Sequence, residues 1–415
     1  MYGGLQDNGS QGGPVRSRNR VGVRTSDWWN AGGGDGFQPR IDPTDPDVVY
    51  SQSQNAAVSR TDRRTGESKS IRPRERDVRF HWDTPLLVSP HNSKRVYLAG
   101  SKLFRSDDRG DTWKAVSPDL TRNLDPNKQE VMGKVWGADA VSKNTFTTAL
   151  STATSFDESP LQEGLLYVGT DDGLLQVSAD GGLTWRKEEA FPSVPQHAYV
   201  SDVFASGQDV NTVYMAFNHY QRGDFKPYLL KSTDRGKSWT SIAGNLPARH
   251  CVWSVVEDHV NPDLLFAGTE FGLFVTLDGG ANWSKVPGPP TVMFRDLEIQ
   301  KREGDLVCGT FGRGIFILDD YAALRGLTAE ARAKDAVLLP VRKTLAFTEL
   351  SYTRAAGEFA APNPPSGALV TYHLRESVKD KLVLKVTDAA GKAVTEVNAP
   401  SAAGVHRINW DLRGA

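Results

Sequence analysis

The chain has 415 residues, with 49 Lys and Arg against 50 Asp and Glu and a formal net charge of −1. This balance argues against a general nucleic-acid binder, whose affinity comes mainly from neutralising phosphates, and no apolar run approaches the length of a membrane span. The 39 glycines, 23 prolines and ten tryptophans are typical of an all-β protein with many tight turns.

The N-terminal residues 1–31 predict a small sheet that lacks its first strand. Met1-Tyr2-Gly3-Gly4-Leu5 leads straight into what reads as the middle of a strand, without a signal peptide. The C-terminus at Ala415 also falls inside a predicted strand series. We therefore expect a fragment of a longer protein, less stable than a chain extended at both ends because unpaired edges invite association.

Four later segments share the pattern Ser/Thr-x-Asp-x-Gly-x-polar-Trp, each after a pair of predicted strands. Its Asp can fold back onto the backbone N–H groups of its own turn, its Gly can take a positive φ, and its Trp offers a large apolar surface for packing between sheets. The residues assigned this structural role are Asp108, Trp113, Asp180, Trp185, Asp234, Trp239, Asp278 and Trp283.

Weaker copies of the repeat begin at Val48 and Leu306. With the partial first repeat they make seven positions, and repeats of this length with four strand signals predict propeller blades, because one small sheet cannot bury both faces alone. We predict a seven-position β-propeller over residues 1–325. The long connection at 119–142 is expected to cross one face, where long loops tend to be functional.

The pattern changes after Tyr321. A short helix is predicted at 327–336, within a linker or extended segment that covers 326–360. Residues 361–415 alternate in polarity as sandwich strands. This part is predicted to be the start of a truncated β-sandwich.

Metal and cofactor signals are weak. The histidines are scattered, and no Cys/His spacing resembles a zinc site, so no metal or cofactor is predicted. The acidic segments at 7–9, 171–173 and 319–320 could bind Ca²⁺ only if neighbouring carbonyls converge. Cys251 and Cys308 lie in different repeats and are expected to be lone core thiols.

The repeated turn resembles the Asp-box (BNR) hairpin of sialidase-like propellers. Together with GGLQDNGS, HWDTPL, GTDDGLL and GTFGRGIFILDDYAALRGL, it resembles a bacterial sortilin-like (VPS10-type) propeller family, often labelled glycosyl hydrolase. The tail is similar to an immunoglobulin-like module of secretion-associated proteins. The resemblance implies an extracytoplasmic, non-catalytic module that recognises a peptide, a protein or a glycan.

The alternative is a glycoside hydrolase. The run GGGDGFQPRIDPTDPDVVYSQSQNAAVSR resembles the blades of propeller-type xyloglucanases, in which a catalytic Asp follows the strand. Here the corresponding position holds Gln54, and an amide can neither give nor take the proton that glycoside hydrolysis needs. An enzyme would therefore use two other carboxylates out of Asp7, Asp35, Asp83, Asp139 and Glu270.

Tryptophans outside the Asp boxes are the best candidates for ligand binding. They stand beside polar residues near the predicted starts of inner strands, and such starts converge on one mouth of a propeller ring. An aromatic ring beside a carboxylate suits stacking on sugars or gripping a peptide, whereas packing between blades is the competing explanation. The predicted ligand-binding residues are Trp28, Asp35, His81, Trp82, Asp83, Trp136, His250 and Trp253.

Overall fold

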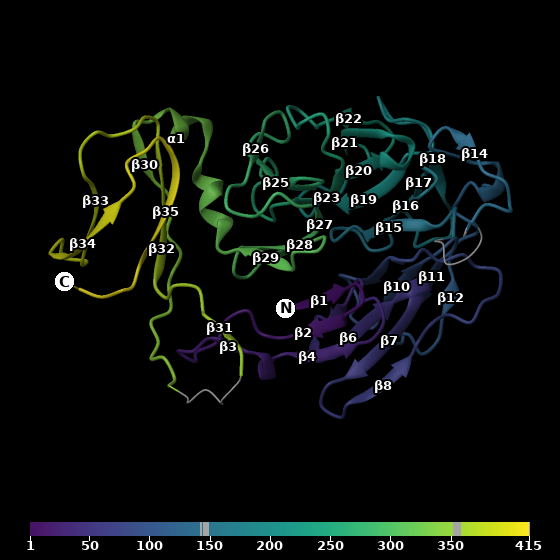
Figure 1. The fold of residues 1–415 in the computed structure, drawn as a ribbon, viewed down its shortest axis with the longest axis horizontal. Coiled ribbons are helices and arrows are strands. Elements are labelled where there is room, and N and C mark those ends of the chain that lie inside the picture. The colour runs from purple at the N-terminus through teal and green to yellow at the C-terminus, as the bar shows by residue number, and fades with distance from the viewer. Residues whose placement is uncertain (142, 144–148, 352–357, 415) are drawn as a thin grey trace.

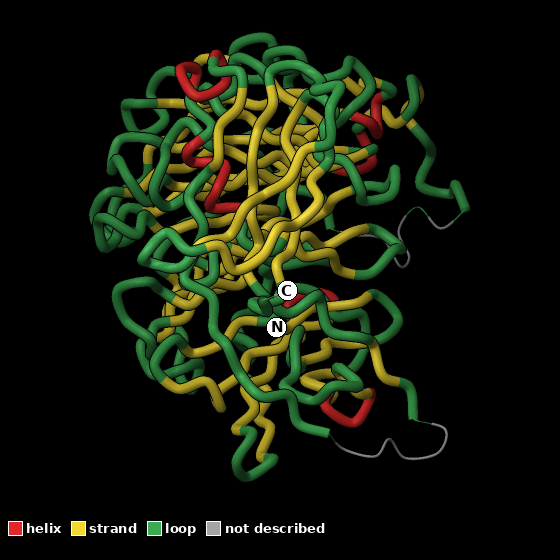
Figure 2. Tube along the Cα trace, turned by 90° about the vertical axis from the view of Figure 1, so that its left-hand side faces the viewer, coloured by secondary structure: helices red, strands yellow, loops and turns green. Residues whose placement is uncertain are grey.

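In the computed structural model, the described residues are 1–141, 143, 149–351 and 358–414. Seven antiparallel sheets follow one another along the chain and form the predicted all-β propeller (Figure 1). Figure 2 shows strands in both the propeller and the C-terminal part, with only short helical turns between them.

Five consecutive sheets have four strands, each beginning with the strand nearest the axis. The second sheet comprises β5 (Arg40–Asp42), β6 (Asp45–Ser53), β7 (Ala57–Asp62) and β8 (Glu67–Ser70). The third comprises β9 (Leu86–Val88), β10 (Val96–Ala99), β11 (Leu103–Ser106) and β12 (Lys114–Ala115). The fourth comprises β15 (Ala153–Glu158), β16 (Leu166–Thr170), β17 (Leu175–Ser178) and β18 (Arg186–Glu188). The fifth comprises β19 (Tyr199–Ala205), β20 (Val213–His219), β21 (Asp224–Ser232) and β22 (Thr240–Ser241), and the sixth β23 (Val252–Glu257), β24 (Leu265–Thr269), β25 (Gly272–Thr276) and β26 (Trp283–Lys285).

The first and last sheets have three strands each. The first comprises β1 (Tyr2–Leu5), β2 (Gly9–Gly12) and β4 (Trp29–Gly32), and the last comprises β27 (Phe294–Gln300), β28 (Asp305–Thr310) and β29 (Ile315–Leu318). The two sheets lie side by side, since a Cβ on Gly3 would stand 2.5 Å from the Cδ1 of Ile315. In sequence, β1 corresponds to the second strand of the other sheets, so the innermost position of the first sheet holds no strand, as predicted.

The Asp-box turns are closed by their own side chains. In the fourth sheet, Asp180 Oδ1 accepts bonds from Thr184 N at 2.9 Å and Ser178 Oγ at 2.8 Å, and Ser178 Oγ accepts from Gly182 N at 2.8 Å. The other three boxes repeat this arrangement around Asp108, Asp234 and Asp278. Hydrogen bonding from Thr184 holds the pKa of Asp180 at about 2.

The tryptophan of a box reaches the preceding sheet. Trp113 Nε1 donates to Ile71 O at 2.5 Å, Trp185 Nε1 to Val116 O at 3.2 Å, and Trp283 Nε1 to Ile242 O at 2.8 Å. Each acceptor lies just beyond the outermost strand of the sheet before. These indoles therefore pack between blades and do not face the axis.

The C-terminal part begins with η5 (Tyr321–Gly326) and α1 (Ala329–Ala333), where a helix was predicted. A three-stranded sheet follows, made of β30 (Ala336–Leu338), β32 (Ala368–Leu374) and β35 (Gly404–Trp410), and β33 (Leu382–Thr387) pairs with β34 (Ala393–Ala399). The predicted strands are present. Their assignment to an immunoglobulin-like sandwich, and the domain boundaries at 325 and 361, remain predictions.

A clasp joins this C-terminal part to the first sheet. The short strand β31 (Ala360–Ala361) pairs with β3 (Val23–Arg24), in the excursion between β2 and β4. Asn363 Oδ1 accepts from Ser17 N at 2.9 Å, and Asn363 Nδ2 donates to Asn19 O at 2.9 Å. Arg16 also pairs with Asp319, which follows the last sheet. The two ends of the ring are thus linked through side chains and a two-residue ladder.

We expect Asn363→Ala to lower the free energy of unfolding by about 1–2 kcal/mol, because two backbone groups lose their partner. Urea denaturation followed by tryptophan fluorescence measures the change. Ser366→Ala, at an exposed position three residues on, is the matched control and should stay within about 0.5 kcal/mol of the parent.

Candidate ligand-binding site

A β-bulge recurs at the same place in four neighbouring inner strands. The register skips one residue after the first residue pair of β15, β23 and β27, and after the second pair of β19. The skipped residues are Thr154, Ser201, Trp253 and Arg295. A bulge re-aims its side chain relative to the regular ladder, so these four side chains occupy equivalent positions around the ring.

Two of the bulge residues fasten neighbouring blades. Thr154 Oγ1 donates to Val200 O at 2.7 Å, and Ser201 Oγ donates to Val252 O at 2.7 Å. In the next two strands the same position carries Trp253 and Arg295, which have no such bond. The bulge residue therefore bonds to the next blade in two sheets, and in the other two it is a large side chain, Trp253 or Arg295.

Trp253 and Arg295 stack on each other. The guanidinium carbon of Arg295 lies 4.8 Å from the centre of the Trp253 ring, and Trp253 Nε1 donates to Glu270 Oε2 at 3.0 Å. Arg295 Nη2 is also 3.6 Å from Asp83 Oδ2. The ring of Tyr220 is also close, with its centre 5.7 Å from that of Trp253. A cationic group and aromatic faces are thus fixed between two carboxylates.

His81 and Tyr199 complete this group, which we call the channel mouth (His81, Asp83, Tyr199, Trp253 and Arg295). His81 Nε2 lies 3.5 Å from the Tyr199 hydroxyl, and its Nδ1 lies 3.1 Å from Asp83 N. Burial, assisted by Arg295, lowers the pKa of His81 to about 4, so the ring is neutral at neutral pH. Burial raises the pKa of Asp83, and Arg295 opposes that shift.

Acidic side chains of the inner strands line the channel below the mouth. Asp157 Oδ2 accepts from Ala205 N at 2.8 Å, and Asp202 Oδ2 accepts from Val255 N at 2.8 Å, each bond reaching the inner strand of the next sheet. Burial raises the pKa of both carboxyls to about 7. Asp296 and Glu298 continue the series on β27 and are exposed. None of the four was predicted, although polar residues alternate with apolar ones in YVSDVFA and RDLEIQ.

Exposed aromatic residues gather at the same end of the propeller. In an antiparallel sheet, the loop between the second and third strands lies at the end where the first strand begins. Four exposed rings lie on or beside such loops, on three adjacent sheets: Tyr220, Phe225, Phe271 and Phe311. The mouth is therefore bordered by several aromatic side chains.

The structure brings together only some of the predicted ligand-binding residues. His81, Asp83 and Trp253 meet at the mouth, and Trp82, half-buried, lies between the first two in sequence. His250 is half-buried two residues before β23, with its ring edge-on to Phe271 and Phe274.

Trp28 and Asp35 do not lie at inner-strand starts, contrary to prediction. Trp28 directly precedes β4, the edge strand of the first sheet farthest from the axis. Asp35 is 6% exposed, and its Oδ1 accepts from Asp7 N at 2.9 Å, so it supports the β1–β2 turn. Gln54 lies beside Asp35, and its side-chain Oε1 accepts from Asp35 N at 3.3 Å. The Gln54 side chain thus supports the local backbone.

Trp136 and Asp139 were also predicted at an inner-strand start, and this too is wrong. They lie in the long connection between the third and fourth sheets, which carries a hairpin of β13 (Glu130–Val131) and β14 (Lys134–Val135) near β18 in Figure 1. Trp136 is exposed, and Lys134 Nζ lies 4.4 Å from the centre of its ring.

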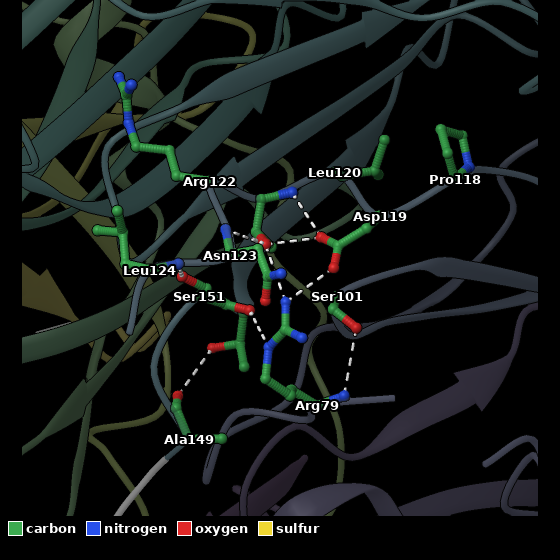
Figure 3. A network of polar contacts seen from close by, with 12 residues as sticks. Arg79, Ser101, Pro118, Asp119, Leu120, Arg122, Asn123, Leu124, Ala149 and Ser151 are labelled. Carbon is green, nitrogen blue, oxygen red and sulfur yellow. Dashed lines mark hydrogen bonds and ion pairs between the residues drawn. The ribbon is translucent and has the colours of Figure 1, made fainter. Parts of the chain in front are cut away.

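Arg79 holds both ends of this connection (Figure 3). It donates from Nη2 to Asp119 Oδ2 at 2.8 Å and from Nε to Ser151 O at 3.1 Å. Ser151 Oγ in turn accepts from Leu124 N at 2.8 Å. Arg79 lies two residues before His81, so the base of the connection is tied to the segment that carries the mouth.

The rest of the described chain was compared with the requirements of metal sites and membrane helices. Among the described residues, no group of three or more His, Cys, Asp or Glu side chains is placed to hold a metal ion. Within the same residues, no helix is long and apolar enough to cross a membrane. Two cavities outside the channel, of about 410 and 390 Å³, are lined largely by charged side chains, many of them in ion pairs.

Comparison with known proteins points to xyloglucanases. A xyloglucanase of Acetivibrio thermocellus is 26% identical over 285 residues, which cover 59% of this chain and 31% of the relative. A xyloglucanase of Hypocrea jecorina is 28% identical over 139 residues, covering 31% of this chain and 17% of the relative. The chain thus spans less than a third of the length of either curated relative, and no protein-family profile matches it.

Among solved structures, the GH74 xyloglucanase of Xanthomonas campestris superposes with a TM-score of 0.51 at 19% identity. The match covers 98% of this chain and 70% of that one. At this identity the likeness supports the propeller fold alone. The predicted resemblance to sortilin-type propellers stays a prediction.

The channel carboxyls predict a specific pH dependence. Asp202 keeps its proton in the folded state up to about pH 7 but loses it near pH 4 when unfolded, so its contribution to stability falls as pH rises through that range. We expect Asp202→Asn to gain stability relative to the parent between pH 5 and about pH 8.

Urea denaturation of the parent and of Asp202→Asn across this pH range measures the difference in their free energies of unfolding. His81 contributes a pH dependence of opposite sign, but it is present in both proteins and cancels in the difference. Asp180→Asn is the control. Hydrogen bonds hold the pKa of the Asp180 carboxyl near 2, so this carboxyl does not change its protonation between pH 5 and 8. A stability difference independent of pH would contradict the assignment of Asp202.

Proposed function

We propose that this chain is a glycan-binding propeller of the glycoside-hydrolase type, and that a β-glucan chain binds across the channel mouth. The observation that carries the proposal is the exchange of blade-fastening residues for Trp253 and Arg295 at two bulge positions. The exposed ring of Tyr220, held beside the buried Trp253–Arg295 stack, is a preorganised platform for a sugar ring, because aromatic faces stack on the apolar faces of pyranoses.

Polar groups around this platform suit hydroxyl recognition. Asp83, Glu270, His81 and Tyr199 offer acceptors and donors within one small region, as sugar sites require. The similarity to xyloglucanases favours a polysaccharide over the peptide that a sortilin-like protein would bind. An extracytoplasmic location follows from the same resemblance and is proposed with it.

Asp83 is the candidate acid if the chain hydrolyses its ligand. Burial raises its pKa, and a general acid must hold its proton near the working pH. Arg295, 3.6 Å away, is placed to stabilise the carboxylate after proton transfer. Gln38 Nε2 donates to Asp83 Oδ1 at 3.3 Å and orients the group.

The proposal is tested first by binding. We expect xyloglucan oligosaccharides to bind in isothermal titration, and Trp253→Ala to weaken binding by about 1–3 kcal/mol. Since Trp253 is buried and Tyr220 is exposed, Tyr220→Ala is a second variant with less effect on the fold. Leu183→Ala, exposed on an Asp-box turn, is the control. Binding of peptides but not of any glucan would refute the glycan proposal.

Hydrolysis is tested separately. Reducing-end release from xyloglucan should be lost in Asp83→Asn while oligosaccharide binding persists, because the amide keeps the hydrogen bond but cannot give up a proton in the same way. Release unaffected by the substitution would remove Asp83 from the catalytic role. Binding without any release would restrict the chain to recognition.

A further inference from the structure

A segment with three exposed arginines crosses the end of the propeller that carries the channel mouth. Residues 71–78 connect β8, the outermost strand of the second sheet, with the segment of His81 and Asp83. A connection from the last strand of one antiparallel sheet to the first strand of the next lies at the end where inner strands begin. Lys102, in the loop between β10 and β11 at that same end, pairs with Glu75. The segment is thus fastened to the mouth end of the third sheet.

The three arginines share the solvent side of this segment. Ile71 and Pro73 are buried, whereas Arg72, Arg74 and Arg76 are exposed. Proline keeps the residue before it out of the helical region, and successive side chains of an extended chain point in opposite directions. The guanidinium groups therefore form one row, which we call the basic strip (Arg72, Arg74 and Arg76).

The basic strip carries positive charge that the described part of the chain does not neutralise. Arg64, on the preceding turn of the second sheet, lies 2.9 Å from Asp45 and 2.8 Å from Asp62. No residue of the basic strip forms such an ion pair within the described residues. Of the two acids in the segment, Glu75 is paired with a lysine of the third sheet, and Asp77 alone stands against three arginines.

A buried ring holds the first of these arginines next to the mouth. The guanidinium carbon of Arg72 lies 5.3 Å from the centre of the Phe80 ring. Phe80 is 6% exposed, packs against Phe104 of the third sheet and directly precedes His81. A cation stacked on a ring is positioned without using its N–H donors, which stay available to a ligand. The basic strip therefore begins beside the mouth.

Oxyanions are the groups that this strip suits best. A guanidinium presents a planar fork of donors that matches the paired oxygens of carboxylates and phosphates. The mouth itself carries the carboxylates of Asp83 and Glu270, which repel an anion but accept hydrogen bonds from sugar hydroxyls. The two regions thus favour different parts of one ligand, charged on the strip and neutral at the mouth.

The spacing of the strip favours charges repeated along a chain. Side chains on one side of an extended segment start from Cα atoms about 6–7 Å apart. A single small anion does not reach all three arginines at that spacing, whereas substituents along a polymer do.

We propose that the ligand of this chain is an acidic polysaccharide, a β-glucan whose anionic substituents bind the basic strip while an uncharged ring occupies the channel mouth. The substituents are carboxylates or ester sulfates, which share the oxyanion chemistry that arginine recognises. This inference rests on the proposed function and narrows its class of ligand.

Isothermal titration with three cello-oligosaccharides of equal length, one neutral, one carboxymethylated and one sulfated, tests the proposal. We expect at least one charged form to bind about tenfold more tightly than the neutral form, because three exposed ion pairs together contribute about this factor. The advantage should disappear at about 1 M NaCl, where exposed charges are screened. Equal affinities of all three forms would overturn the inference and leave the proposed function standing. Binding of none of them would count against the proposed function itself.

Variants of the chain locate the effect. A triple variant of the strip should lose the tenfold advantage and still bind the neutral form as the parent does: Arg72→Gln, Arg74→Gln and Arg76→Gln. The matched control removes the same charge from exposed positions of the C-terminal part and should keep the advantage: Lys379→Gln, Lys381→Gln and Lys385→Gln. Equal losses in both triple variants would show that only the net charge matters and would overturn the assignment of the strip.

An acidic peptide distinguishes a protein partner from a glycan. We expect a peptide with the same number of charges to bind more weakly than the charged oligosaccharide, because it has no sugar ring for the mouth. Binding of the peptide with equal affinity, unchanged in Tyr220→Ala, would assign the basic strip to a protein partner and refute the polysaccharide.

Discussion

Hydrogen bonds between neighbouring inner strands hold this propeller together near its axis. Hydroxyls at the bulges and the carboxylates of Asp157 and Asp202 bind backbone groups of the next sheet. The apolar faces of the sheets supply most of the burial, but apolar packing is non-directional. The hydrogen bonds fix the position of each inner strand relative to the next one. The distances between the side chains of the channel mouth depend on these relative positions.

The same bonds explain why acidic groups are tolerated in the channel. A buried carboxyl is costly as an anion, and the shift of its pKa toward neutrality reduces this cost by keeping the proton on. A protonated carboxyl still accepts a backbone N–H through its carbonyl oxygen. Inner strands can therefore carry acids facing the axis, and a bulge position can hold Trp253 or Arg295 where the neighbouring sheets supply the fastening.

Much of the fold was predictable because its determinants are local. An Asp-box turn is closed by hydrogen bonds between residues two to four positions apart, such as Ser178 with Asp180 and Asp180 with Thr184. The pattern is therefore visible in the sequence. The mouth was predicted in part, since His81 and Asp83 lie shortly before an inner strand and Trp253 lies near the start of another. Trp28, Asp35 and Trp136 were misplaced because connections differ in length between sheets. Asp157 and Asp202 were missed because a single acid in an apolar strand has no short-range signature, and only the next sheet reveals its partner.

The clasp has a consequence for the order of folding. Ser17 and Asn363 are 346 positions apart, and contacts of such long range form late because the intervening chain must first be ordered. Each middle sheet can form from its own hairpins as the chain emerges, but the first sheet meets its final partners only when residues beyond 360 exist. During synthesis the clasp thus cannot form until residues 360–363 have been made. A ribosome-bound chain ending before residue 360 should therefore expose the edge at β3 to chaperones or to other nascent chains.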